Sequence, residues 1–295
     1  MPIDDAWEFV DAHVHHWDLG ANPWYPALQT QPGDDLDVGL GEMSGLRRNY
    51  LPLDYQHDSA RYRVNKAVHV SAVTAPGTVV HESRWLSSLS SSTGWPAGVI
   101  GSLDPEATTS TWERDLSAQA ENPRFRGIRI LYGLGPRSPR VGHLLGMLAE
   151  RDLVFDLVTS PAQMANYARL LEGTPSLRVV VEHAGWPENE DPAHVAQWRS
   201  GMNALASLGD RMTCKVSGLA MMLHGIDEAR LRPWVEGCIE VFGTERCFFA
   251  SNFPVDALYG TYDDLLGAYR AITAPMGHEV QRRLFVTNAE STYRI

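Results

Sequence analysis

Eight short apolar runs, each followed by a stretch of helical periodicity, are the feature that most constrains the fold of this chain. The runs cover residues 9–15, 66–72, 95–101, 125–130, 153–157, 177–183, 212–216 and 247–250. Apolar strands that alternate with helices are typical of a parallel sheet covered on both faces. Eight such units within 295 residues fit a closed barrel. We therefore predict the α/β class and a single (β/α)8 TIM barrel domain over residues 1–295.

The helical stretches and one long loop complete this prediction. Helices are expected from about Val79 onward and over 109–120, 141–150, 162–171, 193–206, 230–242, 262–272 and 279–285. Residues 17–63 hold prolines, glycines and aromatic residues without a period, as in Asn22–Pro26 and Gln31–Asp35, which predicts a long loop after the first strand. A loop of this length is either part of a functional site or a surface excursion packed by its own side chains.

The charge balance limits the partners of the chain. Lys and Arg number 25 and Asp and Glu number 36, so the formal net charge is −11. Nucleic acids and anionic membranes both require a basic surface, and we expect neither as a partner. The charge balance is compatible with a small-molecule substrate, including an anionic one held by a few local arginines. The sequence leaves homo-oligomer formation open.

Cysteine use and the N-terminus bear on the compartment. Cys214, Cys238 and Cys247 are odd in number and form no Cys-x-x-Cys pair, which disfavours a disulfide framework and fits a reducing compartment. Residues 1–5 lack the basic region followed by an apolar segment that marks a signal peptide. No apolar run approaches the roughly 18 residues of a membrane span. We expect a cytoplasmic protein.

Ionisable and polar residues gather where the predicted strands end. His13 and His15 are two residues apart on the first strand, so their side chains point to the same face. Two converging imidazoles form half of a metal site or an acid/base pair. Further polar residues at strand ends are His69, Ser71, Arg129, Tyr132, Asp156, His183, Lys215, Ser217 and residues 251–256.

Each of these residues alone also has a structural interpretation. A histidine on an apolar strand is commonly a core residue with satisfied hydrogen bonds, and an arginine at a strand end is commonly half of an ion pair. Seven strands that deliver such groups to one rim favour an active site, because the carboxyl ends of barrel strands carry the chemistry. The cations Arg129 and Lys215 suit an anionic or carbonyl-rich substrate.

Four motifs resemble the amidohydrolase superfamily. They are Asp-Ala-His-x-His at 11–15, Glu-His-Ala-Gly at 182–185, Lys-Val-Ser-Gly-Leu at 215–219 and Ser-Asn-Phe-Pro-Val-Asp at 251–256. Shorter matches lie at 66–70, 81–86, 127–129 and 288–294. The closer resemblance is to the amidohydrolase-related branch, which includes sugar-lactone and 2-pyrone-4,6-dicarboxylate lactonases. It implies a TIM barrel that hydrolyses a lactone, ester or amide.

The resemblance also implies a divalent metal such as zinc, held by His13, His15 and His183. Two positions depart from the superfamily pattern. Asp156 stands where strand five would supply a histidine ligand, and Asn252 stands where strand eight would supply an aspartate. An amide cannot act as a general base, so His183, Asp156 and Asp256 remain candidates for that role. Three neutral imidazoles can hold zinc, but some lactonases of this branch work without metal, so the metal stays open.

The predicted hydrolase site combines catalytic and substrate-binding groups. His183, Asn252 and Asp156 are the catalytic candidates, and His69, Arg129, Tyr132 and Lys215 are the substrate-binding candidates. The expected substrate is a small, carboxylate-bearing carbonyl compound. Two alternatives stay open: a metal-dependent decarboxylase of a small unsaturated or aromatic acid, and a barrel with a degraded site that acts as a binder.

Overall fold

Eight parallel strands form one sheet in the order in which they occur in the chain, which confirms the predicted barrel. The computed structural model describes residues 8–29 and 41–295. The strands are β1 (Glu8–Val14), β2 (Arg63–Val70), β3 (Gly98–Gly101), β4 (Phe125–Arg129), β5 (Val154–Leu157), β6 (Arg178–Val181), β7 (Met212–Val216) and β8 (Cys247–Phe249). The ring closes just beyond β8, where the Asn252 amide donates to the His13 carbonyl and the His15 amide donates to the Phe253 carbonyl, each at 2.8 Å.

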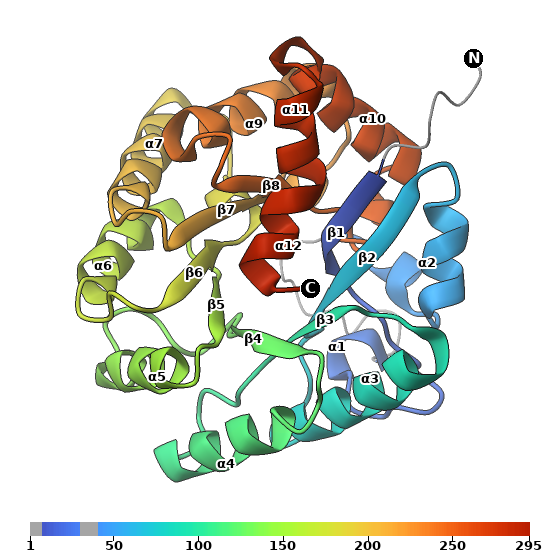
Figure 1. Cartoon of the computed structure of the whole chain (residues 1–295), viewed down its shortest axis with the longest axis vertical. Coiled ribbons are helices and arrows are strands. Elements are labelled where there is room, and N and C mark those ends of the chain that lie inside the picture. Colours follow the sequence, from blue (N-terminus) through green and yellow to red (C-terminus); the bar gives the residue numbers. More distant parts are fainter. Residues whose placement is uncertain (1–7, 30–40) are drawn as a thin grey trace.

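Helices surround this ring of strands (Figure 1). The larger ones are α3 (Val79–Thr93), α4 (Thr109–Gln119), α5 (Pro139–Glu150), α6 (Pro161–Leu171), α7 (Pro192–Ala206), α9 (Glu228–Phe242) and α10 (Tyr262–Thr273). The shorter ones are α1 (Pro26–Gln29), α2 (Pro52–Asp58), α8 (Leu219–Leu223), α11 (His278–Arg282) and α12 (Asn288–Tyr293). None of the described helices has the length and apolar character needed to cross a membrane.

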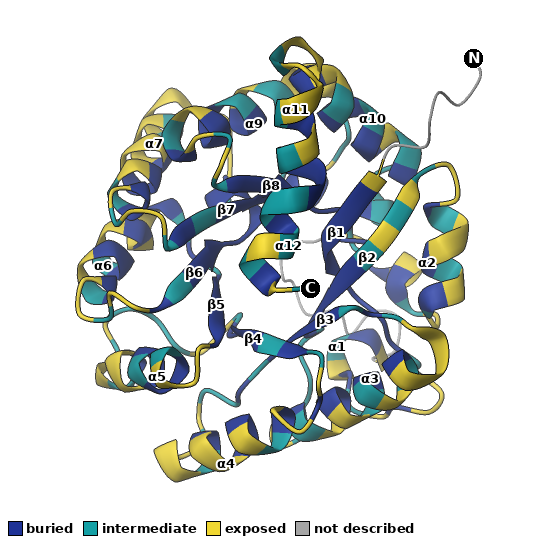
Figure 2. Ribbon diagram, viewed as in Figure 1, coloured by how far each residue is buried: buried dark blue, intermediate teal, exposed yellow. Residues whose placement is uncertain are grey.

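Local signals in the sequence set where the large helices begin. The helices α5, α6 and α7 start at a proline, a residue whose fixed φ suits the first helical turn. Thr108 and Asp227 cap α4 and α9 by accepting a hydrogen bond from a backbone amide of the first turn. Each helix then turns its apolar side inward, and Figure 2 shows buried strands inside a shell of helices whose outer sides are exposed.

The strand ends differ from the prediction at β6. This strand was expected to reach His183 but ends at Val181, because His183 and Ala184 adopt positive φ angles of 51° and 53°. Left-handed residues cannot continue a ladder. The turn carries Glu182 and His183 away from the strand wall and over the barrel interior.

The long segment after β1 is only partly irregular. Residues 41–62 contain the helix α2, which the sequence did not predict, and residues 17 and 50 form an antiparallel bridge. Tyr50 and Tyr55 from this segment are fully buried. Gln31–Asp35 and residues 1–7 lie outside the described residues, so the loop prediction is tested only in part.

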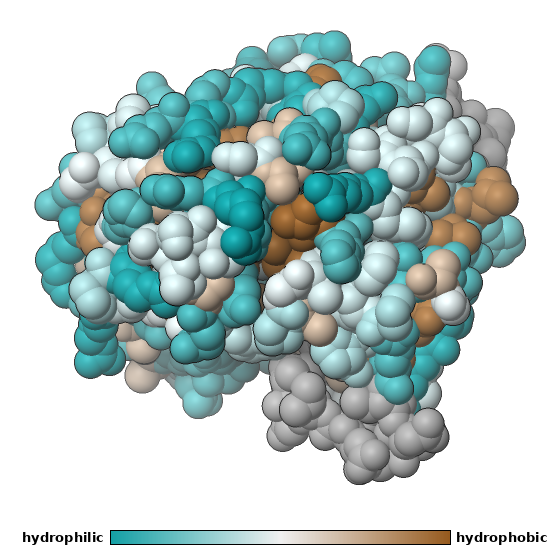
Figure 3. Space-filling model, turned by 90° about the horizontal axis from the view of Figure 1, so that it is seen from below, coloured by the Kyte–Doolittle hydropathy of each residue, from teal (hydrophilic) through white to brown (hydrophobic). Residues whose placement is uncertain are grey.

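The C-terminal helix α12 lies over the centre of the barrel (Figure 1). Its Glu290 pairs with Lys66 near the start of β2, so α12 covers the end at which the strands begin. The buried ring of Tyr293 extends from this helix into the barrel. The opposite end, where the strands finish, is therefore the open one. On the face seen in Figure 3, hydrophobic residues are visible in a central hollow and at separate places toward one side, among hydrophilic ones.

We predict that Gly127→Ala destabilises the barrel wall. A Cβ atom at Gly127 would lie 2.0 Å from the carbonyl oxygen of Val154, its register partner on β5. We expect the free energy of unfolding in urea to fall by about 1–3 kcal/mol, the range for overpacked sites. The control is Gly146→Ala in α5, where nothing lies within 4 Å of the new Cβ atom and alanine favours the helix. Equal stabilities of the two variants would contradict this account of the wall.

Candidate active site

His13 and His15 converge at the open end of the barrel, as their spacing predicted. Their Nε2 atoms lie 3.3 Å apart, and both side chains are buried. The Nδ1 atom of His15 lies 2.7 Å from the carbonyl oxygen of Val70, which can only accept, so this nitrogen carries the proton. The Nε2 atom of His15 therefore presents a lone pair toward His13.

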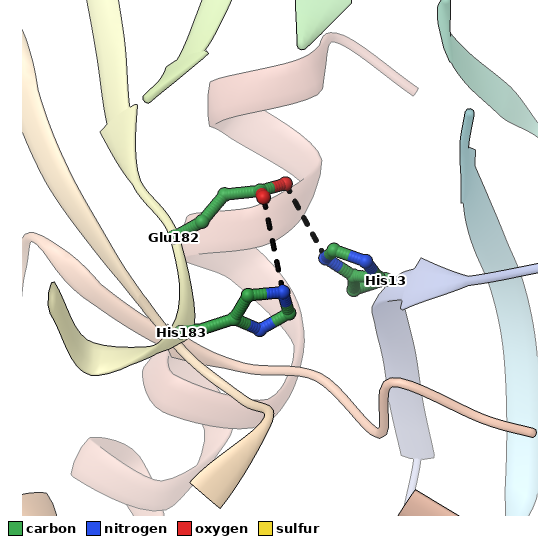
Figure 4. Close-up of side chains that lie close together, drawn as sticks. All are labelled: His13, Glu182 and His183. Carbon is green, nitrogen blue, oxygen red and sulfur yellow. Dashed lines mark ion pairs between the residues drawn. The ribbon is translucent and has the colours of Figure 1, made fainter. Parts of the chain in front are cut away.

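Glu182 connects this pair to the rest of the site. Its Oε1 atom lies 3.1 Å from Lys215 Nζ and 3.4 Å from His13 Nδ1. Its Oε2 atom lies 3.4 Å from Arg129 Nη1 and 3.8 Å from His183 Nε2. Figure 4 shows this carboxylate, which follows directly after β6, facing both imidazoles. One fully buried carboxylate thus faces two cations and two histidines.

The charges around Glu182 determine how these groups are protonated. Burial would raise the pKa of Glu182, but the charges of Lys215 and Arg129 outweigh burial and hold that pKa below its ordinary value. Burial lowers the pKa of His13 and His15 well below the ordinary value and lowers the pKa of His183 to about 3. At neutral pH the carboxylate is therefore ionised and the imidazoles are neutral.

A second buried carboxylate lies deeper in the barrel. Asp156 Oδ2 accepts hydrogen bonds from Lys215 Nζ at 2.5 Å and from the Tyr293 hydroxyl at 2.8 Å. Burial raises the pKa of Asp156 to about 7, although the charge of Lys215 opposes this shift. Lys215 is thus held between Asp156 and Glu182, and its ammonium group faces the barrel interior.

The histidines and Glu182 suit a divalent cation. The ligand atoms of His13, Glu182 and His183 all lie within 4.8 Å of one another, and His15 adjoins this group through His13. With His13 Nδ1 turned toward Glu182, two Nε2 lone pairs face each other at 3.3 Å. This is about the separation of two nitrogens on a tetrahedral zinc ion, and a cation between them would remove their repulsion. The neutral imidazoles and ionised carboxylate are already in the protonation states that metal binding needs.

A cavity of about 230 Å³ opens above these residues. Four of its polar lining residues are His15, Arg129, His183 and Asn252. Its walls are mainly apolar and include Trp17, Leu28, Met43, Leu46, Leu131, Trp186, Met221 and Val255. An apolar cavity with a few convergent polar groups is the usual form of a small-molecule site.

The cavity adjoins a second hollow of about 290 Å³, and the two share Pro26, Val73, Arg129, Leu131 and Tyr132. Tyr132 is 53% exposed and stands at the rim. Of the predicted substrate-binding residues, Arg129 and Tyr132 line these cavities, whereas Lys215 and His69 do not. His69 instead accepts a hydrogen bond from the His16 amide, and its Nε2 atom lies 3.6 Å from Glu82.

The catalytic candidates are placed at different depths. His183 and Asn252 line the cavity, and Asp156 lies below it among Lys215 and Tyr293. The sequence analysis assigned no role to Glu182, although this residue stands inside the Glu-His-Ala-Gly motif. The sequence did contain a signal for its role. Glu182 is a carboxylate that stands directly after an apolar strand and beside a candidate histidine.

Asn252 is fixed by Asp256, four residues later. The Nδ2 atom of Asn252 donates to Asp256 Oδ1 at 2.9 Å, and the Met221 amide donates to the same oxygen at 3.3 Å. Burial raises the pKa of Asp256 to about 7, although these hydrogen bonds oppose the shift. The other oxygen, Oδ2, is buried and has no hydrogen-bond partner among the described residues, so it can carry the proton.

Three comparisons place this geometry among known proteins. A family model described as amidohydrolase matches residues 10–295. An uncharacterised protein of Sinorhizobium fredii is 31% identical over 97% of this chain and 98% of its own length. The L-fucono-1,5-lactonase of Burkholderia ambifaria is 28% identical over 97% of this chain and 95% of its own length. The crystal structure of an amidohydrolase from Burkholderia multivorans with bound zinc aligns with a TM-score of 0.80 and 22% identity, over 97% of this chain and 99% of that one.

We predict that Glu182→Gln strongly destabilises the protein. The change removes the countercharge between Arg129 and Lys215, and an uncompensated buried charge costs about 3–5 kcal/mol. The matched control is Glu240→Gln, because Glu240 is 61% exposed and pairs with Arg199 on the outer surface. We expect this control to cost less than about 1 kcal/mol. Urea denaturation measures both, and similar small losses would show that Glu182 is not the countercharge of the two cations.

We also predict a pH-dependent stability effect at Asp256. Its pKa is about 7 in the folded protein and about 3.9 in an unfolded chain, so the folded state binds the proton more tightly. The stabilisation is complete below about pH 4 and is lost as the pH rises through about 7. Relative to Asp256→Asn, the wild-type protein should lose about 2 kcal/mol between about pH 5 and about pH 7 in urea denaturation. Asp210→Asn, at an exposed position, should show no such trend, and a pH-independent difference at Asp256 would contradict the assignment.

Proposed function

Because this chain belongs to the amidohydrolase family and is a hydrolase, we propose that it hydrolyses a small lactone in the cavity at the open end of the barrel. The observation that carries this proposal is that His15, Arg129 and His183 all line the same cavity. These groups supply cationic and imidazole hydrogen-bonding atoms to a substrate carbonyl. The relatives named as lactonases support a cyclic ester as the substrate.

Arg129 is the residue we assign to the carbonyl oxygen. Its guanidinium contacts Glu182 through Nη1 and the Ser71 carbonyl through Nη2, and these contacts fix its plane. The remaining N–H groups of a guanidinium can then stabilise the negative charge that forms on the oxygen when water attacks. A carboxylate on the substrate would also be held by Arg129, because Lys215 lies below the cavity.

His183 is the residue we assign to the proton of the attacking water. Of the three candidates for the general base, it is the one that lines the cavity. Its Nδ1 atom lies 3.0 Å from the Ser217 hydroxyl, which fixes the ring, and its Nε2 atom lies 3.8 Å from Glu182. Accepting the proton at Nε2 would create an imidazolium beside an ionised carboxylate. Its low pKa in the free site keeps the imidazole unprotonated at neutral pH, and the adjacent carboxylate of Glu182 would stabilise the imidazolium that forms.

Zinc is the metal we propose for the histidine group. His13 and His15 would hold it through their facing Nε2 atoms, with Glu182 close by, which leaves Nε2 of His183 for the proton of the attacking water. The bound zinc of the B. multivorans amidohydrolase supports this choice. When bound, zinc supplies a Lewis acid for the carbonyl and lowers the pKa of water. We propose that Lys215 and Asp156 support Glu182 from below instead of contacting the substrate, and that His69 has a structural role through Glu82.

We predict that His183→Ala lowers kcat/KM for lactone hydrolysis by roughly 100- to 10,000-fold, as expected for loss of a general base. The substrate panel should contain L-fucono-1,5-lactone, the substrate named for the B. ambifaria relative. Hydrolysis is followed by proton release in a weakly buffered solution. The control is His143→Ala, an exposed histidine on α5, which should keep full activity. Full activity in His183→Ala would exclude the assignment.

Metal content gives an independent measurement. We expect about one zinc per chain by mass spectrometry of the purified protein and a loss of that zinc in His13→Ala. A metal-free wild-type protein with full lactonase activity would leave the histidines and Arg129 as the carbonyl-activating groups and would exclude a metal role. Release of carbon dioxide from carboxylated acids, with no lactone hydrolysis, would favour the decarboxylase alternative.

A further inference from the structure

We propose that Asn252 recognises a hydroxyl group of the substrate through its side-chain oxygen, and that Asp256 is the positioning residue that aims this oxygen into the cavity. This proposal rests on the proposed function, because it names the residue that would select hydroxylated lactones in the same cavity. It gives the amide at the end of β8 a role that requires no ionisation.

The backbone of Asn252 is held in place on both sides. Its amide donates to the His13 carbonyl at 2.8 Å, and its carbonyl accepts from the Val255 amide at 2.8 Å. Its φ angle is 59°, in the left-handed region that asparagine tolerates better than most residues. The side chain therefore leaves a rigid backbone at one fixed point in the cavity lining.

Asp256 decides which end of the amide faces the cavity. Its Oδ1 atom already accepts from the Met221 amide, so it is an acceptor whether or not Oδ2 carries a proton. The group that faces it must donate, and this places Nδ2 of Asn252 toward Asp256, with the Met221 sulfur 3.8 Å away. The oxygen of the amide must then point the other way.

That oxygen is an acceptor without a partner. Asn252 is 1% exposed and lines the cavity, and its Oδ1 atom has no hydrogen bond to any described residue. An amide oxygen in a cavity lining can accept a hydrogen bond from an O–H or N–H group of a ligand. The walls around it are mainly apolar, so this oxygen is one of the few groups that can discriminate between ligands.

The same geometry explains why position 252 carries an amide and not a carboxylate. An ionised aspartate there would have no N–H to donate and would face Asp256 at hydrogen-bond distance, where two carboxylates do not both ionise readily. The amide donates to one carboxylate and accepts from a ligand at the same time. This combination fits a neutral hydroxyl donor on the substrate.

The test compares two lactones of equal ring size. D-glucono-1,5-lactone carries hydroxyl groups and δ-valerolactone carries none. We expect Asn252→Leu to lower kcat/KM for the hydroxylated lactone roughly 10- to 100-fold, mainly through KM, because a site built for a hydrogen bond loses it. The loss for δ-valerolactone should be much smaller, so that the ratio of the two kcat/KM values falls by about tenfold or more. Asp256→Asn should cause a smaller loss for the hydroxylated lactone alone, because either end of the new amide can face Asn252.

Asn203→Leu on α7 is the matched control, and both lactones should react as in the wild-type protein. Equal losses for both lactones in Asn252→Leu would show a merely structural role and overturn the proposal.

Binding of the unreactive ring ethers 1,5-anhydroglucitol and tetrahydropyran, measured by calorimetry, separates this proposal from the lactonase function. Binding of 1,5-anhydroglucitol that Asn252→Leu weakens supports the proposal even without turnover of any lactone, whereas binding that the variant leaves unchanged overturns it.

Discussion

The buried carboxylate of Glu182 is the constraint on which the arrangement of the site depends. Arg129 and Lys215 are 5% and 0% exposed, and without an anion between them their charges would repel in a medium that screens poorly. Glu182 meets both cations and still has lone pairs for His13 and His183. The cost of burying the charges is therefore offset by one group with four contacts. Glu182 follows directly after β6, and its partners His13, Arg129 and Lys215 come from β1, β4 and β7, so the contacts connect four strands at the site.

Strand ends with left-handed residues turn this buried network into an open site. His183, Ala184 and Asn252 all have positive φ angles and lie two or three residues beyond the end of β6 or β8. The side chains of His183 and Asn252 line the cavity at the barrel mouth instead of extending the wall. Strain of this kind persists where surrounding contacts hold it, as the backbone hydrogen bonds of Asn252 with His13 and Val255 do. The cavity thus depends on rigid backbone positions at its base.

The sequence predicted the ring of strands and much of the cavity lining, because both follow from local periodicity. Alternation placed His13 and His15 on one face, and the parallel order brought Arg129, His183 and Asn252 to one rim. The depth of Lys215 and the four contacts of Glu182 depend on the barrel radius and on Tyr293 at the far end of the chain. No local pattern encodes those distances. The helix α2 was not predicted for a different reason. Its seven residues are too few to show a helical period, and they lie inside a segment dominated by prolines and aromatics.

The site therefore has two layers with different physical tasks. In the lower layer, Asp156, Lys215, Glu182 and Arg129 neutralise one another, and little net charge is left to attract a ligand. In the upper layer, the imidazoles of His15 and His183 are neutral at physiological pH, and Asn252 cannot ionise. Recognition must then rest on the direction of hydrogen bonds and not on charge, apart from the exposed edge of Arg129. A substitution that changes charge below should act on stability and on pKa values, and one that changes hydrogen-bond direction above should act on the choice of substrate.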